Sequence, residues 1–207
     1  MPVTRIAAAQ RADILAGFET SHSMGVSVNV NPGAGGHVYG IVVYGFTADV
    51  SLSGDPVSCT WTGGTAVPLL ASPLLFGSNQ NMLMAWIFDS PVSGTPEVSH
   101  TGIGTSLWVK GRMLTAGVWS QAAALDLDNI ASTVVTEVGS GAVATETVTV
   151  PSIKPASRVI AAHLVGRSKR FSGYSGTRVA VANTVGSINS FSGNGQMILG
   201  ECRGAAS

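Results

Sequence analysis

Hydrophobic and polar residues alternate along much of this chain with a period of two, the spacing that places successive side chains on opposite faces of a β-strand. In residues 57–62 the Val, Cys and Trp side chains share one face, while the Ser and Thr side chains share the other. Residues 38–46 and 82–88 are apolar on both faces, so they are predicted to be central strands covered on two sides. Asp89, Ser90 and Pro91 follow the second of these, and the proline, which has no backbone N–H, predicts that the strand ends there.

Further strand-like segments recur along the whole sequence. They comprise residues 25–30, 106–112, 117–120, 142–150, 158–165, 177–182 and 196–201. Clusters of Gly, Pro, Asn and Ser separate the segments, and the pair Gly63-Gly64 permits a primed two-residue turn. Turn signals at such short intervals favour an all-β domain, an antiparallel sandwich or barrel with little helix, as a single domain over residues 1–207.

Two segments depart from the strand pattern. Residues 5–18 are rich in Ala and could form a helix, but they lack a convincing cap pair and precede a strand-rich chain, so their state stays open. Residues 126–132 predict a short helical turn at most. Helix is therefore expected to be a minor part of the fold.

The charge composition narrows the functional classes. Only 11% of residues are charged and the formal net charge is zero, so the basic field expected of a nucleic-acid-binding protein is missing. A chain near zero net charge also self-associates readily, which favours an oligomer. The longest apolar run, residues 82–88, is far shorter than the roughly 20 residues that span a bilayer, and no signal peptide is recognised. Cys59 and Cys202 allow one disulfide, but two buried free thiols are the favoured interpretation.

No group of residues has the spacing of a catalytic, cofactor or metal site. Residues 139–144 match a relaxed dinucleotide-binding pattern, but a strand-like segment follows where a helix N-terminus is needed to bind phosphate. Residues 173–176 are one residue short of a serine nucleophile elbow. His163 is interpreted as a core residue, and metal-site spacing is missing at all four histidines, His22, His37, His100 and His163. We therefore expect no enzyme activity, no cofactor and no metal ion.

One dense cluster of positive charge lies in the C-terminal third of the chain. Arg167, Lys169 and Arg170 are followed closely by Tyr174. They form a candidate interaction loop that would meet an acidic partner, a phosphate or a glycan sulfate. The favoured alternative is a solvated hairpin tip.

Four tryptophans lie within strand-like segments. Trp61 and Trp86 fall on apolar faces and are predicted core residues. For Trp108 and Trp119 the sequence pattern does not settle which face of the strand the side chain lies on. These two are the candidate glycan-stacking residues, because sugar-binding modules expose tryptophan rings as platforms. A core position is the favoured interpretation for these two as well.

Five segments in a fixed order carry a resemblance to a known family. They are residues 36–43, the hairpin Thr-Gly-Gly-Thr-Ala-Val-Pro-Leu-Leu of residues 62–70, the apolar strand with Ser-Pro of residues 84–91, the Gly-Val-Trp of residues 117–119, and the Met-Ile-Leu-Gly-Glu-Cys-Arg-Gly-Ala-Ala of residues 197–206. In this order they resemble a family of β-sandwich virion proteins of tailed bacteriophages, the minor tail and head decoration proteins of actinobacterial phages. The acidic residue of that family's second strand is absent, with His37 and Tyr39 nearby instead.

The resemblance implies a jelly-roll-like sandwich with structural or adhesive work and no catalytic residues. We therefore expect a virion structural protein, in the first place a minor tail protein, assembled in the host cytoplasm as a homo-oligomer with other virion proteins. One alternative is a capsid decoration protein that stabilises the head. Another is a carbohydrate-binding adhesion module that contacts a glycan of the host cell surface. Neither a nucleic-acid partner nor a membrane span is expected.

Overall fold

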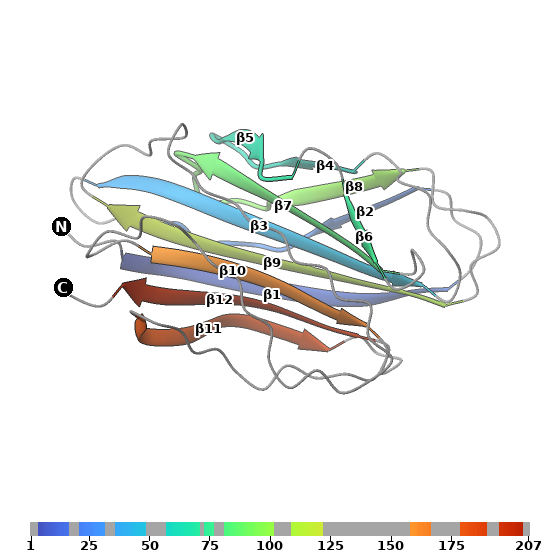
Figure 1. Cartoon of the computed structure of the whole chain (residues 1–207). Coiled ribbons are helices and arrows are strands. Elements are labelled where there is room, and N and C mark those ends of the chain that lie inside the picture. Colours follow the sequence, from blue (N-terminus) through green and yellow to red (C-terminus); the bar gives the residue numbers. More distant parts are fainter. Residues whose placement is uncertain are drawn as a thin grey trace.

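Strands make up every named element that the structure describes. The computed structural model describes residues 4–16, 21–31, 36–48, 57–70, 73–76, 81–101, 109–121, 158–166, 179–189 and 195–204. All strand pairings in this part of the chain are antiparallel (Figure 1). The strands are β1 (Thr4–Ala16), β2 (Ser21–Gly25), β3 (His37–Ala48), β4 (Val57–Thr60), β5 (Thr65–Pro68), β6 (Leu74–Phe76), β7 (Asn81–Asp89), β8 (Glu97–Thr101), β9 (Val109–Gln121), β10 (Arg158–Gly166), β11 (Val179–Asn189) and β12 (Gly195–Gly204). The prediction of an all-β antiparallel fold is confirmed.

A six-stranded sheet forms the centre of the molecule. Its order is β1-β9-β3-β7-β5, and β6 also pairs with β7. Because β9 pairs with both β1 and β3, strands that are far apart in sequence lie side by side. The register places Arg112 of β9 opposite Asp13 of β1 on one side and opposite Phe46 of β3 on the other.

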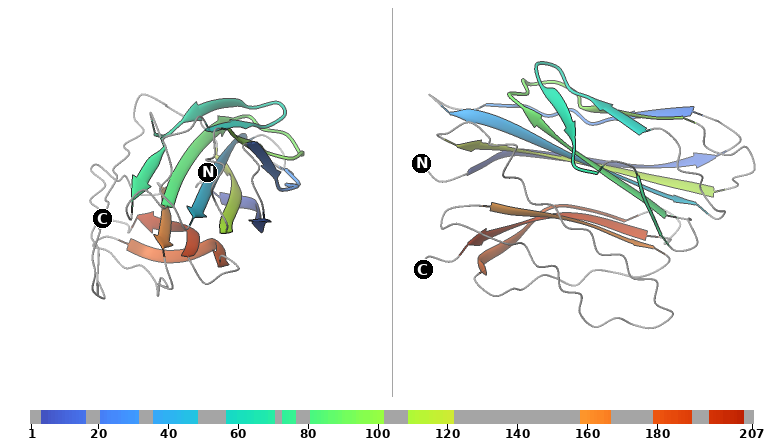
Figure 2. Two further views of the ribbon diagram at one scale, coloured as in Figure 1. Left: turned by 90° about the vertical axis from the view of Figure 1, so that its right-hand side faces the viewer. Right: turned by 45° about the horizontal axis from the view of Figure 1, so that its top comes forward.

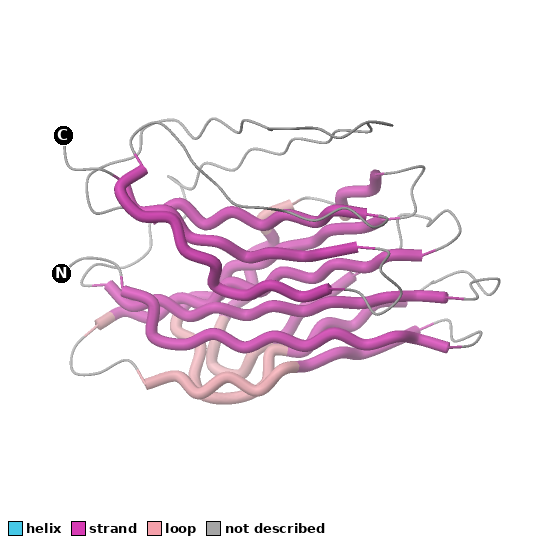
Figure 3. Tube along the Cα trace, turned by 90° about the horizontal axis from the view of Figure 1, so that it is seen from below, coloured by secondary structure: helices cyan, strands magenta, loops and turns pink. Residues whose placement is uncertain are grey.

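Two three-stranded sheets lie over opposite faces of this central sheet. One has the order β2-β8-β4 and the other has the order β10-β12-β11. Figure 2 shows the C-terminal sheet on one side of the central strands and β2, β4 and β8 on the other. Seen from the side of the C-terminal sheet, the long strands of the layers run alongside one another (Figure 3). The described strands thus form three layers.

Two apolar cores separate the layers. The first core, between the central sheet and β2-β8-β4, comprises Met24, Val28, Val38, Val42, Tyr44, Phe46, Cys59, Trp61, Met82, Met84, Trp86, Phe88, Val98, Leu114, Ala116 and Val118. The second core, on the opposite face, comprises Ile41, Val43, Leu83, Ala85, Ile87, Met113, Trp119 and Met197. Successive side chains of β3 and β7 alternate between the two cores, and residues 81–88 are all buried. The prediction that residues 38–46 and 82–88 are central strands covered on both sides is confirmed.

The Ala-rich N-terminal segment is a strand. β1 pairs with β9 along its whole length, with one bulge between Arg5 and Ala7. Ala7 and Ala9 pack against the first core. Helix propensity is worth only a fraction of a kcal/mol per residue, so pairing with a long neighbouring strand overrides it here.

Some predicted strand bounds are wrong. The strand expected at residues 25–30 lies earlier, as β2, and Val28 forms only an isolated bridge with Gly94. The segments expected at residues 106–112 and 117–120 include parts of one continuous strand, β9, because pairing on both edges carries the strand through Thr115 and Ala116. Strands β10, β11 and β12 confirm the strands expected near residues 158–165, 177–182 and 196–201. The expected segments at residues 126–132 and 142–150 lie outside the described residues.

The turn after β4 differs from the expected primed turn. Its closing hydrogen bond runs from the N–H of Gly64 to the carbonyl of Trp61 at 3.1 Å, so Thr62 and Gly63 are the central residues. Only the second of them, Gly63, has a positive φ, of 77°. That combination is typical of a type II turn, which needs glycine at its third position.

The strand order does not establish the jelly-roll-like connectivity, which stays a prediction. None of the described segments forms a helix long and apolar enough to cross a membrane.

Candidate functional site: a polar cluster between two sheets

The candidate interaction loop lies outside the described residues. Arg167, Lys169, Arg170 and Tyr174 fall between β10 and β11, in a segment that the structure does not describe. Trp108, one of the two candidate glycan-stacking residues, also falls outside it.

Trp119, the other candidate glycan-stacking residue, is described, and it is not exposed. Its side chain is 3% exposed and belongs to the second core. A stacking platform requires an open ring face, so the glycan-stacking hypothesis is wrong for Trp119 in this fold. The pairing of β9 with both β1 and β3 puts Trp119 in the interior of the central sheet, where the C-terminal sheet covers it. Trp61 and Trp86 are buried, as predicted.

Cys59 is a free, buried thiol. It belongs to the first core, whereas Cys202 lies on β12, in the sheet that covers the opposite face of the central sheet. A disulfide would have to cross that sheet, which the short reach of a disulfide forbids. The favoured interpretation of Cys59 as a buried free thiol is confirmed.

We expect the Cys59 thiol to be almost unreactive in the folded protein. Burial raises the pKa of this thiol to about 12, because the thiolate would lose its hydration. An unfolded cysteine ionises near pH 8.5, so at about pH 8 the folded protein should react with dithiodipyridine at least ~10³-fold more slowly than the protein in urea. The thiol therefore ionises first in the unfolded state, and its contribution to stability is present below about pH 8.5 and is lost as the pH rises towards 12. The measurement uses a Cys202→Ser background, and equal rates with and without urea would contradict the burial.

Two histidines lie opposite one another on the inward face of the β2-β8-β4 sheet. Register pairs His22 of β2 with His100 of β8. Directly opposed side chains on one face of a sheet lie about 5 Å apart between their Cβ atoms. Both residues are buried, with 8% of His22 and 1% of His100 exposed. We call these two residues the histidine pair.

Aromatic side chains of β3 contact His100 from the central sheet. The hydroxyl of Tyr44 and Nδ1 of His100 form a hydrogen bond of 3.2 Å. The His100 ring also packs edge-to-face against Tyr44 and Phe46, with centroid separations of 5.8 Å and 5.1 Å. Burial raises the pKa of the Tyr44 hydroxyl well above its usual range, although the positive charge of Arg112 opposes this. Tyr44 therefore remains a neutral hydrogen-bonding group.

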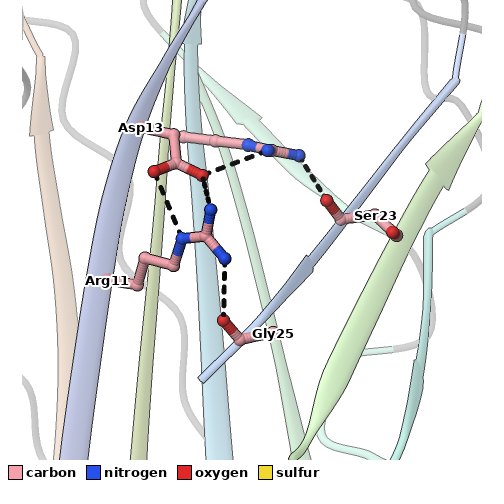
Figure 4. A network of polar contacts seen from close by, with 5 residues as sticks. Arg11, Asp13, Ser23 and Gly25 are labelled. Carbon is pink, nitrogen blue, oxygen red and sulfur yellow. Dashed lines mark hydrogen bonds and ion pairs between the residues drawn. The ribbon is translucent and has the colours of Figure 1, made fainter. Parts of the chain in front are cut away.

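An arginine–aspartate network joins the same two sheets beside this pair. Nη2 of Arg112 lies 3.1 Å from Oδ2 of Asp13, and Nη1 of Arg112 donates to the carbonyl of Ser23 on β2 at 2.6 Å. Arg11 approaches the same carboxylate at 3.0 Å and donates to the carbonyl of Gly25, also on β2. Figure 4 shows both guanidinium groups converging on Asp13 while each extends a second bond to β2. Two charged side chains from the central sheet thus hold the backbone of β2.

The arrangement is suited to fastening one sheet to another. Tyr44 and His100 are buried, and Arg112 and Arg11 each donate a hydrogen bond to a backbone carbonyl of β2. Within the described ranges, no three His, Cys, Asp or Glu side chains come together as a metal site. The combined contacts cross-link β1, β3 and β9 to β2 and β8.

Comparisons with known proteins return no relative. No protein-family model, no curated protein and no solved structure matches the chain.

Proposed function

We propose that this chain is a structural protein of a tailed-bacteriophage virion, and that it is a minor tail protein. It works by assembly with copies of itself and with other virion proteins. The observation that carries the proposal is the place of the resembling segments in the fold. Four of the five lie on β3, β5, β7 and β9, which are consecutive neighbours in the order β9-β3-β7-β5 of the central sheet.

Because these four segments lie on neighbouring strands, the resemblance covers one connected part of the fold. Segments scattered over unrelated elements would match by composition alone, because apolar strands are common. Here the segments pair with one another through the registers of β3 with β7, β3 with β9, and β5 with β7. A jelly-roll-like relative of the virion family would share such a core while differing in its outer layers.

The buried chemistry of the described part supports a structural role. Its polar side chains join one layer to the next, as Arg112 joins the central sheet to β2 and as Tyr44 contacts His100. A virion protein must keep its shape through assembly and through exposure outside the cell. Cross-linked layers with two apolar cores provide that rigidity.

The decisive experiment locates the chain in purified particles. Mass spectrometry of density-purified virions should detect it, and gold-labelled antibodies should bind the tail. Labelling of the head would replace the tail assignment by capsid decoration. Absence of the chain from particles, with a known virion protein detected in the same sample, would overturn both. A glycan array of the purified protein tests the adhesion alternative separately.

A further inference from the structure

We propose that the outer edge of β1 pairs with the same edge of a second copy of this chain, so that two central sheets join into one continuous sheet. The inference deepens the proposed function, because it rests on the proposed assembly of the chain with copies of itself, but it does not depend on the place of the chain in a virion. Its grounds are the exposure of β1 and the charges that β1 carries.

β1 is an outer strand of the central sheet. It has 13 residues, and of the described strands only β9 pairs with it. Ala8, Gln10 and Arg11 are exposed and the other residues of the range 7–13 are half-buried, whereas residues 113–119 of β9 are all buried. A strand in this position presents a row of backbone N–H and C=O groups to which another strand can bind.

Two other sheet edges carry features that block such pairing. β5, the opposite outer strand of the central sheet, has four residues and ends at Pro68, which has no backbone N–H to donate. On β2, the outer strand of the β2-β8-β4 sheet, the carbonyls of Ser23 and Gly25 accept hydrogen bonds from the two arginines of the polar network. β1 contains neither proline nor lysine, and its bulge lies before Ala7. β1 is therefore better suited to edge pairing than either of these strands.

The charges of β1 select one register for antiparallel pairing with a second copy. A two-fold axis at Ala12 places Arg11 of each copy opposite the partner's Asp13, on the same face of the joined sheet. Opposed unlike charges stabilise neighbouring strands, whereas an axis at Arg11 or at Asp13 would oppose two like charges. The axis at Ala12 pairs residues 8–16 of both copies, a segment that excludes the bulge.

The polar network within one chain is compatible with this register. Arg11 contacts Asp13 of its own chain, but 51% of its side chain is exposed, so it can also reach the partner's Asp13 at the new edge. The small side chain of Ala12 lets the two strands approach at the axis. The formal net charge of zero means that two copies carry no overall charge repulsion.

Sedimentation equilibrium of the full chain with Cys202→Ser tests whether the pair forms. We expect the mean mass to rise from that of one chain to that of two as the protein concentration increases. The mass of one chain at every concentration up to millimolar would overturn the inference and would leave the tail assignment to the particle experiment. A dimer formed by a chain that is absent from virions would overturn the virion role alone.

An introduced cysteine locates the axis. Ala12→Cys places two thiols directly opposite one another, with Cα atoms about 5 Å apart, which is within the reach of a disulfide. Gln10→Cys is the matched control, because this register separates the two copies of residue 10 by four positions, or about 13 Å. Air oxidation in the Cys202→Ser background should link Ala12→Cys into a covalent dimer on a non-reducing gel and leave Gln10→Cys unlinked. The reverse result would overturn the register and the proposal with it.

Arg11→Glu tests the charge opposition. It places two negative side chains opposite one another at both symmetric contacts, so the Kd of the dimer should rise at least about 10-fold, and the neutral variant Arg11→Gln should raise it less. Arg5→Glu makes the same charge change outside the paired segment and should leave the Kd almost unchanged. Near-ultraviolet circular dichroism confirms the fold of each variant. Equal effects of Arg11→Glu and Arg5→Glu, or no effect of Arg11→Glu, would overturn pairing through this edge.

Discussion

Replacing Gly40 by alanine is expected to destabilise the protein by about 3 kcal/mol, which corresponds to a fall in Tm of roughly 6–12 °C for a domain of this size. Gly40 lies in β3 on the face of the first core, and the indole of Trp61 occupies the space where a side chain would be. A Cβ at this position would overlap Cζ3 of Trp61 and would lie 2.9 Å from Cε3 and 3.0 Å from Cη2. Urea unfolding followed by circular dichroism measures the loss.

The indole has little freedom to move away. Its Nε1–H donates to the carbonyl of Val92 at 2.9 Å, and its ring packs edge-to-face on Phe88 with a centroid separation of 5.7 Å. A shift of the ring would break the hydrogen bond, and a shift of β3 would disturb its pairing with β7 and β9. Overpacked cores absorb such conflicts only at a cost of this size.

Gly94→Ala provides the matched control. A Cβ there would meet Thr62 at 3.7 Å, an ordinary contact distance, so the change should stay within about 0.5 kcal/mol. In a Trp61→Ala background, Gly40→Ala should lose most of its effect, because the overlapping ring is gone. Equal costs for Gly40→Ala and Gly94→Ala would show that Trp61 does not pack on Gly40.

The strands of the central sheet illustrate what the sequence reveals. Residues 82–88 have no polar position on either face, and a strand of that kind requires cover on both sides, which β7 has. β1 shows the opposite case. Its alanines fit either a helix or a strand, and the choice depends on the edge that β9 offers, more than ninety residues later in the chain.

The polar cluster could be predicted only in part. His22 lies two residues before the apolar Met24, and His100 lies two residues after the apolar Val98. A period of two therefore places each histidine on the same, inward face as its apolar neighbour. That the two histidines face each other depends on the register of β2 with β8, which neither segment encodes alone. The contact of Arg112 with Asp13 joins residues 99 apart in sequence and arises only when β1 and β9 pair. The burial of Trp119 has the same origin, because it depends on a sheet that covers β9 from outside.

Replacing Asp13 by asparagine is expected to destabilise the protein by about 2–3 kcal/mol. The amide keeps the shape of the carboxylate but removes the negative charge between two guanidinium groups. Arg112 depends on that charge, since its side chain is only 11% exposed and its Nε has no hydrogen-bond partner among the described residues. Breaking a buried pair by removing one partner costs about 3–5 kcal/mol, and the 23% exposure of Asp13 lowers the value expected here.

Arg11→Gln separates burial from charge within the same network. Arg11 lies as close to the Asp13 carboxylate as Arg112 does, at 3.0 Å against 3.1 Å, but 51% of its side chain is exposed. Water screens an exposed pair, so Arg11→Gln should cost less than about 1 kcal/mol. Urea unfolding of both variants measures the difference, and hydrogen exchange should show that Asp13→Asn loosens β2 first, because the bond from Arg112 to the Ser23 carbonyl depends on the same guanidinium. Equal costs for the two variants would mean that the layer is held by its apolar core alone, with no contribution from the enclosed arginine.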